Sequence, residues 1–174
     1  MISTKTGQSY RGFSLPEILV ATSIVGILSA ISIPSFVNQM SKGKQGEAHS
    51  LITQVLAQTS AFNDEFGTPA EGWDDLDKMA TIMTSGGRAS GSDFSTINLP
   101  GGHYSLSGSR VGNRYEFKAA AIQGGGIAPS PDPGGPSSNS KYNIVACINV
   151  ATGASDIQAG SGSFAATTEN LKCP

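Results

Sequence analysis

The stretch that decides the fold is Gly12-Phe13-Ser14-Leu15-Pro16-Glu17, which is followed by an uncharged run from residue 18 to residue 41. The run is rich in Ile, Val, Leu and Ala, and about 20 such residues suffice for a helix that spans a bilayer. A carboxylate in hydrocarbon costs roughly 2.5–3.5 kcal/mol on insertion scales. Glu17, at the edge of the run, is therefore expected to have a partner and a function.

Residues 1–12 form a short leader that carries Lys5 and Arg11. A secretory signal peptide is cut after its apolar region, behind small residues. Here the small residue Gly12 precedes the apolar region, so a cut after Gly12 would leave the run on the mature chain as an anchor. The charges of the leader favour a cytoplasmic N-terminus, with the bulk of the chain outside. The alternative is a plain N-terminal membrane anchor in which the Gly12–Phe13 junction has no role.

This arrangement resembles the prepilin signature of type IV pilins and pseudopilins. The resemblance implies cleavage between Gly12 and Phe13, methylation of the new N-terminal Phe13, and a Glu17 that pairs with the N-terminal amine of a neighbouring subunit. Such a desolvated ion pair would set the register of assembly; the alternative is an interfacial carboxylate with no specific partner. Pro16 departs from the family, which more often has a branched aliphatic residue there, but proline costs little in the first turn of a helix.

Two helix breakers, Gly26 and Pro34, interrupt the apolar run. Proline removes a backbone donor and clashes with the preceding turn, so a kink or local unwinding is expected near residues 30–34. The simple interpretation is a kinked membrane helix. The spacing of the pair also resembles type IV pilins, which implies that this stretch takes part in assembly.

Beyond Pro34 the pattern becomes amphipathic and predicts a helix that packs on its own domain. The apolar stripe comprises Val37, Met40, Ala48, Leu51, Ile52, Val55, Leu56, Thr59, Phe62 and Phe66. Gly67 supplies the stop signal. The segment 35–39, Glu47-Ala48 and the helix end at 62–66 resemble the cyanobacterial type IV pilin-like group.

The remaining sequence predicts a loop-rich β region. We expect an irregular connector over residues 67–102, with one short helix near Asp74–Thr84. Strands are expected at 103–107, 114–122 and 142–150, with a turn over 108–113 and weaker strands near 154–158 and 163–168. Residues 124–140, mostly Gly, Pro and Ser, predict an exposed loop.

Charge and cysteine content limit the classes of function. The net charge is −2, and loss of Lys5 and Arg11 with the leader would make it −4. Nucleic-acid binding usually needs a basic patch, and only Arg110, Arg114 and Lys118 offer a modest one. The two cysteines, Cys147 and Cys173, predict one disulfide in an exported chain. The resemblance supports this pairing, and two unpaired thiols are the alternative.

No catalytic, metal-binding or cofactor-binding pattern stands out. His49 and His103 lack partners at metal-ligand spacing. Asp74, Asp75 and Asp77 lack the calcium-loop pattern, which favours a solvated helix start over a calcium site. We therefore expect neither a metal nor a cofactor, and no enzymatic activity.

These observations predict an α+β pilin fold, a long N-terminal helix on a small antiparallel sheet. The expected parts are a cleaved leader (1–12), a transmembrane and assembly half-helix (13–41) and a soluble head (42–174). The head would comprise an amphipathic helix (42–66), the connector (67–102) and a β region (103–174).

The resemblance implies a filament subunit that assembles with itself. It also implies a prepilin peptidase and methyltransferase, an assembly platform and motor ATPases as partners. The precursor would cross the cytoplasmic membrane once, with the head outside, before joining an extracellular pilus. Alternatives are a secretion pseudopilin, a minor or competence pilin, and a membrane-anchored enzyme or binding module.

Overall fold

The structure is a computed structural model that describes residues 12–122, 142–161 and 164–174. The chain divides into two compact units between Phe36 and Val37, and each is described by itself. The loop expected over residues 124–140 lies outside the described residues. The predicted α+β arrangement is confirmed: a long apolar N-terminal helix is combined with a small antiparallel sheet.

The first unit contains the apolar beginning of helix α1, which spans Leu15–Phe66. The helical assignment continues without interruption past Gly26 and Pro34. Of the kink or local unwinding expected near residues 30–34, the unwinding is absent, and the kink stays a prediction. A proline inside a helix removes only one backbone donor, and the flanking turns remain hydrogen-bonded.

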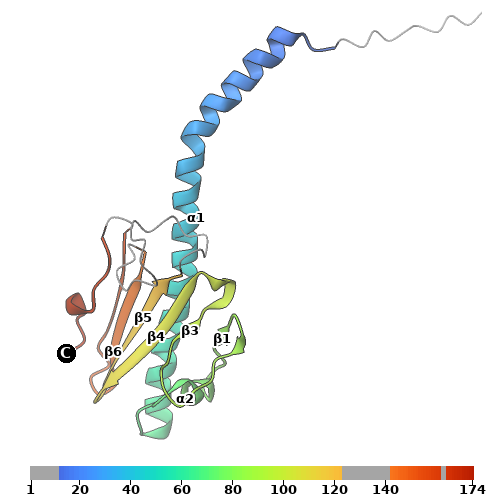
Figure 1. The fold of residues 1–174 in the computed structure, drawn as a ribbon. Coiled ribbons are helices and arrows are strands. Elements are labelled where there is room, and N and C mark those ends of the chain that lie inside the picture. The colour runs from blue at the N-terminus through green and yellow to red at the C-terminus, as the bar shows by residue number, and fades with distance from the viewer. Residues whose placement is uncertain (1–11, 123–141, 162–163) are drawn as a thin grey trace, which may run out of the picture. The chain divides into compact units, whose positions relative to one another are not determined.

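In the second unit the rest of α1 lies against one face of a sheet (Figure 1). Buried side chains recur at the spacing of one helix face at Ala48, Ile52, Val55, Leu56, Thr59 and Phe62, and the polar Ser41 and Gln58 are buried as well. Met40 and Phe66 were expected in this stripe but are exposed. The helix ends where expected, because Gly67 adopts a positive φ of 65° and its N–H donates to the Asn63 carbonyl.

The connector is more ordered than its sequence predicted. It contains a five-residue helix, α2 (Trp73–Asp77), and two-residue strands β1 (Met83–Thr84) and β2 (Gly87–Arg88), which pair with each other. Strand β3 (Ile97–Asn98) and the 3-10 turn η1 (Pro100–Gly102) complete it. The predicted helix near 74–84 was therefore too long. The indole of Trp73 is buried and donates to the Ser95 carbonyl at 2.7 Å, so an aromatic anchor holds this segment.

The main sheet has five antiparallel strands in the order β3-β4-β5-β6-β7. The last four are β4 (Tyr104–Val111), β5 (Arg114–Ala121), β6 (Ile144–Asn149) and β7 (Ser155–Ala159). Five of the six residues of β6 are buried, and the strand lies within the range expected at 142–150. The strand predicted at 163–168 is wrong: its described residues are irregular and lead into the 3-10 turn η2 (Thr168–Asn170).

The expected turn over residues 108–113 is also too long, because β4 continues to Val111 and only Gly112 and Asn113 connect the strands. Gly108 is part of the strand for a steric reason. A Cβ there would lie 2.7 Å from the Phe117 ring and 2.9 Å from Phe94 Cβ. The glycine lets these two rings approach the backbone in the core between the sheet and α1.

Candidate functional site

The N-terminal signature lies at the start of α1, where Gly12 and Phe13 are exposed and precede the first helical residue. In this precursor the Phe13 nitrogen is a peptide nitrogen, so the amine proposed as the partner of Glu17 does not exist before cleavage. The Phe13 side chain is 78% exposed. Nothing in the described unit covers the junction that the signature marks for cleavage.

Ser14 and Glu17 form the first turn of α1. The Ser14 carbonyl accepts from the N–H groups of Glu17 and Ile18, at 3.1 and 3.2 Å. In return, Glu17 Oε2 accepts the Ser14 N–H at 3.4 Å. This is the carboxylate half of a capping box, in which the third helical residue satisfies a donor at the helix start. Sequence reasoning missed this contact, although the Ser-x-x-Glu spacing is its known signal.

The following segment is apolar and uncovered. Residues Leu15–Ile33 have a mean hydropathy of 1.9, and none of this window is buried. Its length and composition suit a membrane-crossing helix, and both partners and lipid are absent from the structure. A monomeric soluble protein rarely exposes so large a continuous apolar surface, so this segment is an interaction surface.

Two small polar residues of this segment bond within the helix: Thr22 Oγ1 donates to the Ile18 carbonyl at 3.0 Å, and Ser23 Oγ to the Leu19 carbonyl at 2.8 Å. A Cβ added at Gly26 would meet no atom within 4 Å. The roles of Gly26 and Pro34 in assembly therefore stay predictions about contacts with other subunits.

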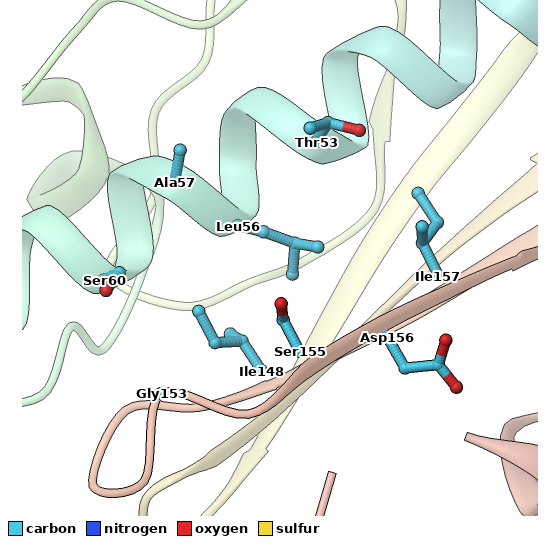
Figure 2. Close-up of a pocket in the computed structure, with 9 residues that line it drawn as sticks. All are labelled: Thr53, Leu56, Ala57, Ser60, Ile148, Gly153, Ser155, Asp156 and Ile157. Carbon is cyan, nitrogen blue, oxygen red and sulfur yellow. The ribbon is translucent and has the colours of Figure 1, made fainter. Parts of the chain in front are cut away.

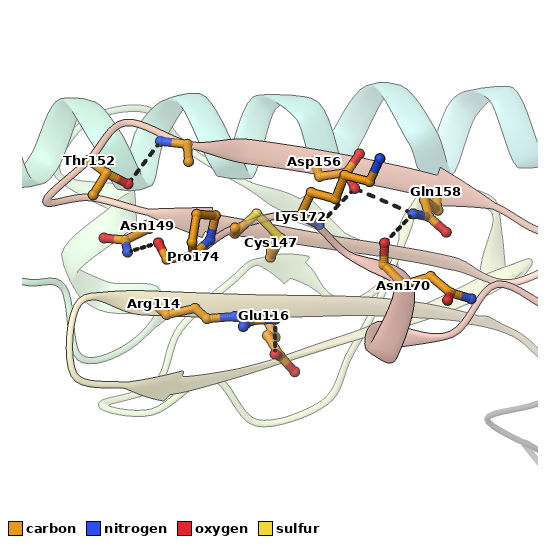
Figure 3. The surroundings of a disulfide bond; sticks show 12 residues. Arg114, Glu116, Cys147, Asn149, Thr152, Asp156, Gln158, Asn170, Lys172 and Pro174 are labelled. Carbon is orange, nitrogen blue, oxygen red and sulfur yellow. Dashed lines mark hydrogen bonds and ion pairs between the residues drawn. A yellow bond between two sulfur atoms is a disulfide. The ribbon is translucent and has the colours of Figure 1, made fainter.

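The C-terminal segment is held against the sheet face that points away from α1. Cys147 of β6 forms the expected disulfide with Cys173, and Val145 and Leu171 pack beside it. The carboxylate of Asp156 accepts the Lys172 N–H at 3.0 Å. Figure 3 shows this contact together with two further ones to the same segment, from Gln158 to the Asn170 carbonyl and from Asn149 to Pro174. These three polar contacts had no recognisable signal in the sequence.

A groove of about 470 Å³ separates α1 from the β6–β7 end of the sheet. Figure 2 shows Leu56 facing Ile148 and Ser155 across it, while the Asp156 carboxylate points away from the helix. The other lining residues are small or aliphatic: Thr53, Ala57, Ser60, Gly153 and Ile157. The groove thus lacks the converging acid, base or nucleophile that catalysis would need.

The acidic residues of α2 are engaged within the fold. Asp75 accepts the Glu71 N–H at 2.9 Å and pairs with Lys78 at 2.8 Å. The hydrogen bond from Lys78 is the main cause that lowers the pKa of Asp75. Asp77 pairs with Arg88 at 2.7 Å, and Asp74 accepts the Gly91 N–H. The described residues contain no group of three side chains suited to a metal ion.

Two of the three basic residues considered for nucleic-acid binding are neutralised by neighbouring carboxylates. Arg114 pairs with Glu116 at 2.8 Å, and Arg110 with Glu71 at 3.5 Å. The expected modest basic patch is therefore reduced to Lys118. A contiguous basic stripe is the usual electrostatic basis of nucleic-acid binding, and these three residues do not provide one.

Comparison with known proteins shows what the signature and the rest of the chain are similar to. Residues 8–33 match the family model described as the prokaryotic N-terminal methylation motif. The chain is 39% identical over 56 residues to the type IV major pilin protein PilA of Myxococcus xanthus (strain DK1622), covering 32% of this chain and 26% of that protein. It is 28% identical over 110 residues to fimbrial protein Q of Moraxella bovis, covering 60% of this chain and 70% of that protein.

The chain therefore spans about a quarter of the first relative, and no solved structure matches it. The finer resemblance to a cyanobacterial group stays a prediction. Both relatives are named as pilus or fimbrial proteins rather than enzymes, which agrees with the expected non-enzymatic role. The N-terminal methylation motif and these two relatives show that the chain is similar to type IV pilins and fimbrial proteins.

Proposed function

We propose that this chain is the structural subunit of a type IV pilus and polymerises through the beginning of α1. The observation that carries the proposal is the uncovered apolar segment Leu15–Ile33, which follows directly on a methylation motif. Before assembly this segment lies in the cytoplasmic membrane, and in the filament equivalent segments of neighbouring subunits replace the lipid. The free energy of assembly then comes from helix packing within the filament.

Processing prepares the subunit for assembly. A prepilin peptidase cuts between Gly12 and Phe13 and methylates Phe13, which creates an N-terminal amine. Glu17 of one subunit pairs with this amine of a neighbour. In a low-dielectric core an unpaired carboxylate is costly, so a subunit added out of register is disfavoured. An assembly platform and motor ATPases extract the subunit from the membrane.

The head faces the exterior in this proposal. Lys5 and Arg11 favour a cytoplasmic leader. The Cys147–Cys173 disulfide agrees with an oxidising compartment for the head, because disulfides persist mainly outside the cytoplasm. A pilus subunit is favoured over a secretion pseudopilin by the two relatives, whose names refer to pili or fimbriae.

Mechanical shearing of cells tests the proposal. A pilus subunit is expected as the abundant protein of the sheared surface fraction, and deletion of its gene is expected to remove the filaments seen by electron microscopy. Complementation with the wild-type gene is the control. If cells carry filaments but the processed chain is found only in their membrane fraction, the proposal of a pilus subunit is contradicted and a pseudopilin is indicated.

A further inference from the structure

Lys118 differs from the three arginines that the structure describes. Arg88, Arg110 and Arg114 each pair with a carboxylate. Among the described residues, Lys118 has no ion pair, although it lies in β5, near the middle of the sheet, and is half-buried. Glu116, two residues away on the same face of β5, pairs with Arg114 instead, so the Lys118 ammonium is open to an anionic ligand.

The register places Lys118 among small polar residues on the sheet face that points away from α1. Its partner in β4 is Ser107, and Ser105 lies opposite both Ala120 of β5 and Asn98 of β3. On the other side Lys118 lies opposite Val145, which packs under the C-terminal segment. That segment covers the β6 side of this face, while the β3–β5 side carries a depression of about 540 Å³.

The lining of this depression has a definite chemical character. Its polar groups are the Lys118 ammonium, the Asn98 amide and the hydroxyls of Thr96, Ser105 and Ser107. Ala120 and Ile122 add apolar surface, and no carboxylate is among the described lining residues. The Ser105 hydroxyl already donates to the Ala120 carbonyl at 3.4 Å and can still accept, whereas the other polar groups can donate to a ligand and one of them is positively charged.

We propose that this depression binds an acidic sugar unit, with its carboxylate on Lys118. The sugar hydroxyls bond to the serine, threonine and asparagine side chains, and a C–H face of the ring rests on Ala120 and Ile122. The volume is within the roughly 300–1,000 Å³ of small-ligand pockets, which favours a ring over a bare oxyanion. The proposal goes beyond filament assembly and does not depend on it, because all these residues belong to the head.

The test uses the full processed chain, isotope-labelled and purified in detergent micelles, titrated with D-galacturonate while amide NMR shifts are recorded. Saturable shifts are expected at Ser107 and Lys118. Neutral D-galactose is expected to bind more weakly because it has no carboxylate for Lys118. Inorganic sulfate is expected to bind more weakly because it has no sugar ring. High salt is expected to weaken galacturonate binding.

Two variants and one control complete the test. Lys118→Gln is expected to weaken galacturonate binding roughly tenfold or more, as for loss of a charge-assisted hydrogen bond. Ser107→Ala, which keeps the charge, is expected to weaken it severalfold. Lys42→Gln removes an exposed lysine of α1 and is expected to have no effect.

Three results would overturn the proposal. The first is the absence of saturable shifts with galacturonate in the folded wild-type chain. The second is equal affinity of folded Lys118→Gln and wild type. The third is sulfate affinity equal to that of galacturonate, since the sugar ring would then contribute nothing.

Discussion

The backbone N–H of Ser14 donates to Oε2 of Glu17 at 3.4 Å, across the first turn of α1. Glu17 therefore has a role in the single chain before any filament forms, because it satisfies a donor at the helix start. Glu17 also carries the charge that the assembly proposal assigns to the neighbouring Phe13 amine. The two roles need different properties of the side chain, an acceptor atom for the cap and a negative charge for the ion pair.

Glu17→Gln separates these roles, because glutamine keeps the acceptor for the Ser14 N–H but removes the charge. Loss of one partner of a buried ion pair costs about 3–5 kcal/mol, so we expect the subunit to fall roughly tenfold or more in sheared surface fractions. Glu47→Gln makes the same change at an exposed position of α1 and should assemble normally. If a correctly processed Glu17→Gln chain forms wild-type amounts of filament, the charge of Glu17 is not needed for assembly and the residue acts only as a helix cap.

The disulfide is expected to stabilise the head mainly by restricting the unfolded chain. Cys147 and Cys173 are 26 residues apart, and closing such a loop is worth about 3.5 kcal/mol in the chain-entropy model. The double variant Cys147→Ser, Cys173→Ser should lose about that much in urea unfolding of the full chain in micelles. Wild-type chain with its disulfide reduced is the matched control. Equal midpoints for oxidised wild type and the double variant would show that the C-terminal segment does not depend on the bond.

A pair of glycine substitutions tests the packing of the core. At Gly108 a new Cβ would meet Phe117 and Phe94 at under 3 Å, and such overpacking typically costs about 1–3 kcal/mol. At Gly43, inside α1, a new Cβ meets nothing within 4 Å, so alanine should stabilise by about 0.5–1 kcal/mol. The midpoint temperature of thermal unfolding should therefore fall for Gly108→Ala and rise for Gly43→Ala. A shift in the same direction would contradict the packing described here.

The buried tyrosines predict a loss of stability in alkali. Tyr115 is buried and donates to the Ala70 carbonyl at 2.8 Å, and Tyr104 is buried and donates to the Tyr142 carbonyl at 2.9 Å. Burial raises the pKa of both hydroxyls above 10.0. Unfolded tyrosines titrate near pH 10. The stabilisation that the two protonated hydroxyls give the folded state is therefore complete below that pH, and it declines as the pH rises towards the higher folded pKa.

Urea midpoints from about pH 8 to about pH 11 measure this effect, and the variant Tyr115→Phe separates it from the titration of lysines, whose unfolded pKa is also near 10. Tyr115→Phe should be about 0.5–1.5 kcal/mol less stable at neutral pH, where its hydrogen bond is lost. Its midpoint should also fall less steeply above pH 10 than that of wild type. Identical slopes would show that Tyr115 ionises equally easily in both states.

Long periodic segments were predictable from the sequence. The apolar run, the amphipathic stripe and Gly67 together predicted α1, and the strand expected at 142–150 corresponds to β6. The disulfide followed from cysteine count and the resemblance. These features depend on local patterns, so one sequence is enough to find them.

Features that depend on tertiary contacts were not predictable. Gly108 was assigned to a turn because its composition is turn-like, but Phe94 and Phe117 need the space beside a strand glycine. A weaker strand was expected near 163–168, but Asn143 fixes Ala166 by two hydrogen bonds and the disulfide holds the C-terminal segment. That Glu116 pairs with Arg114 rather than with Lys118 likewise emerges only from the folded structure.

The measurement that tests the central claim most directly is the intact mass of the chain in filaments sheared from cells. The account predicts a chain that begins at Phe13, carries one methyl group on its N-terminal nitrogen, and lacks two hydrogens because Cys147 and Cys173 are joined. A filament chain that retains Met1–Gly12 would contradict it, because the amine that Glu17 is proposed to bind would not exist.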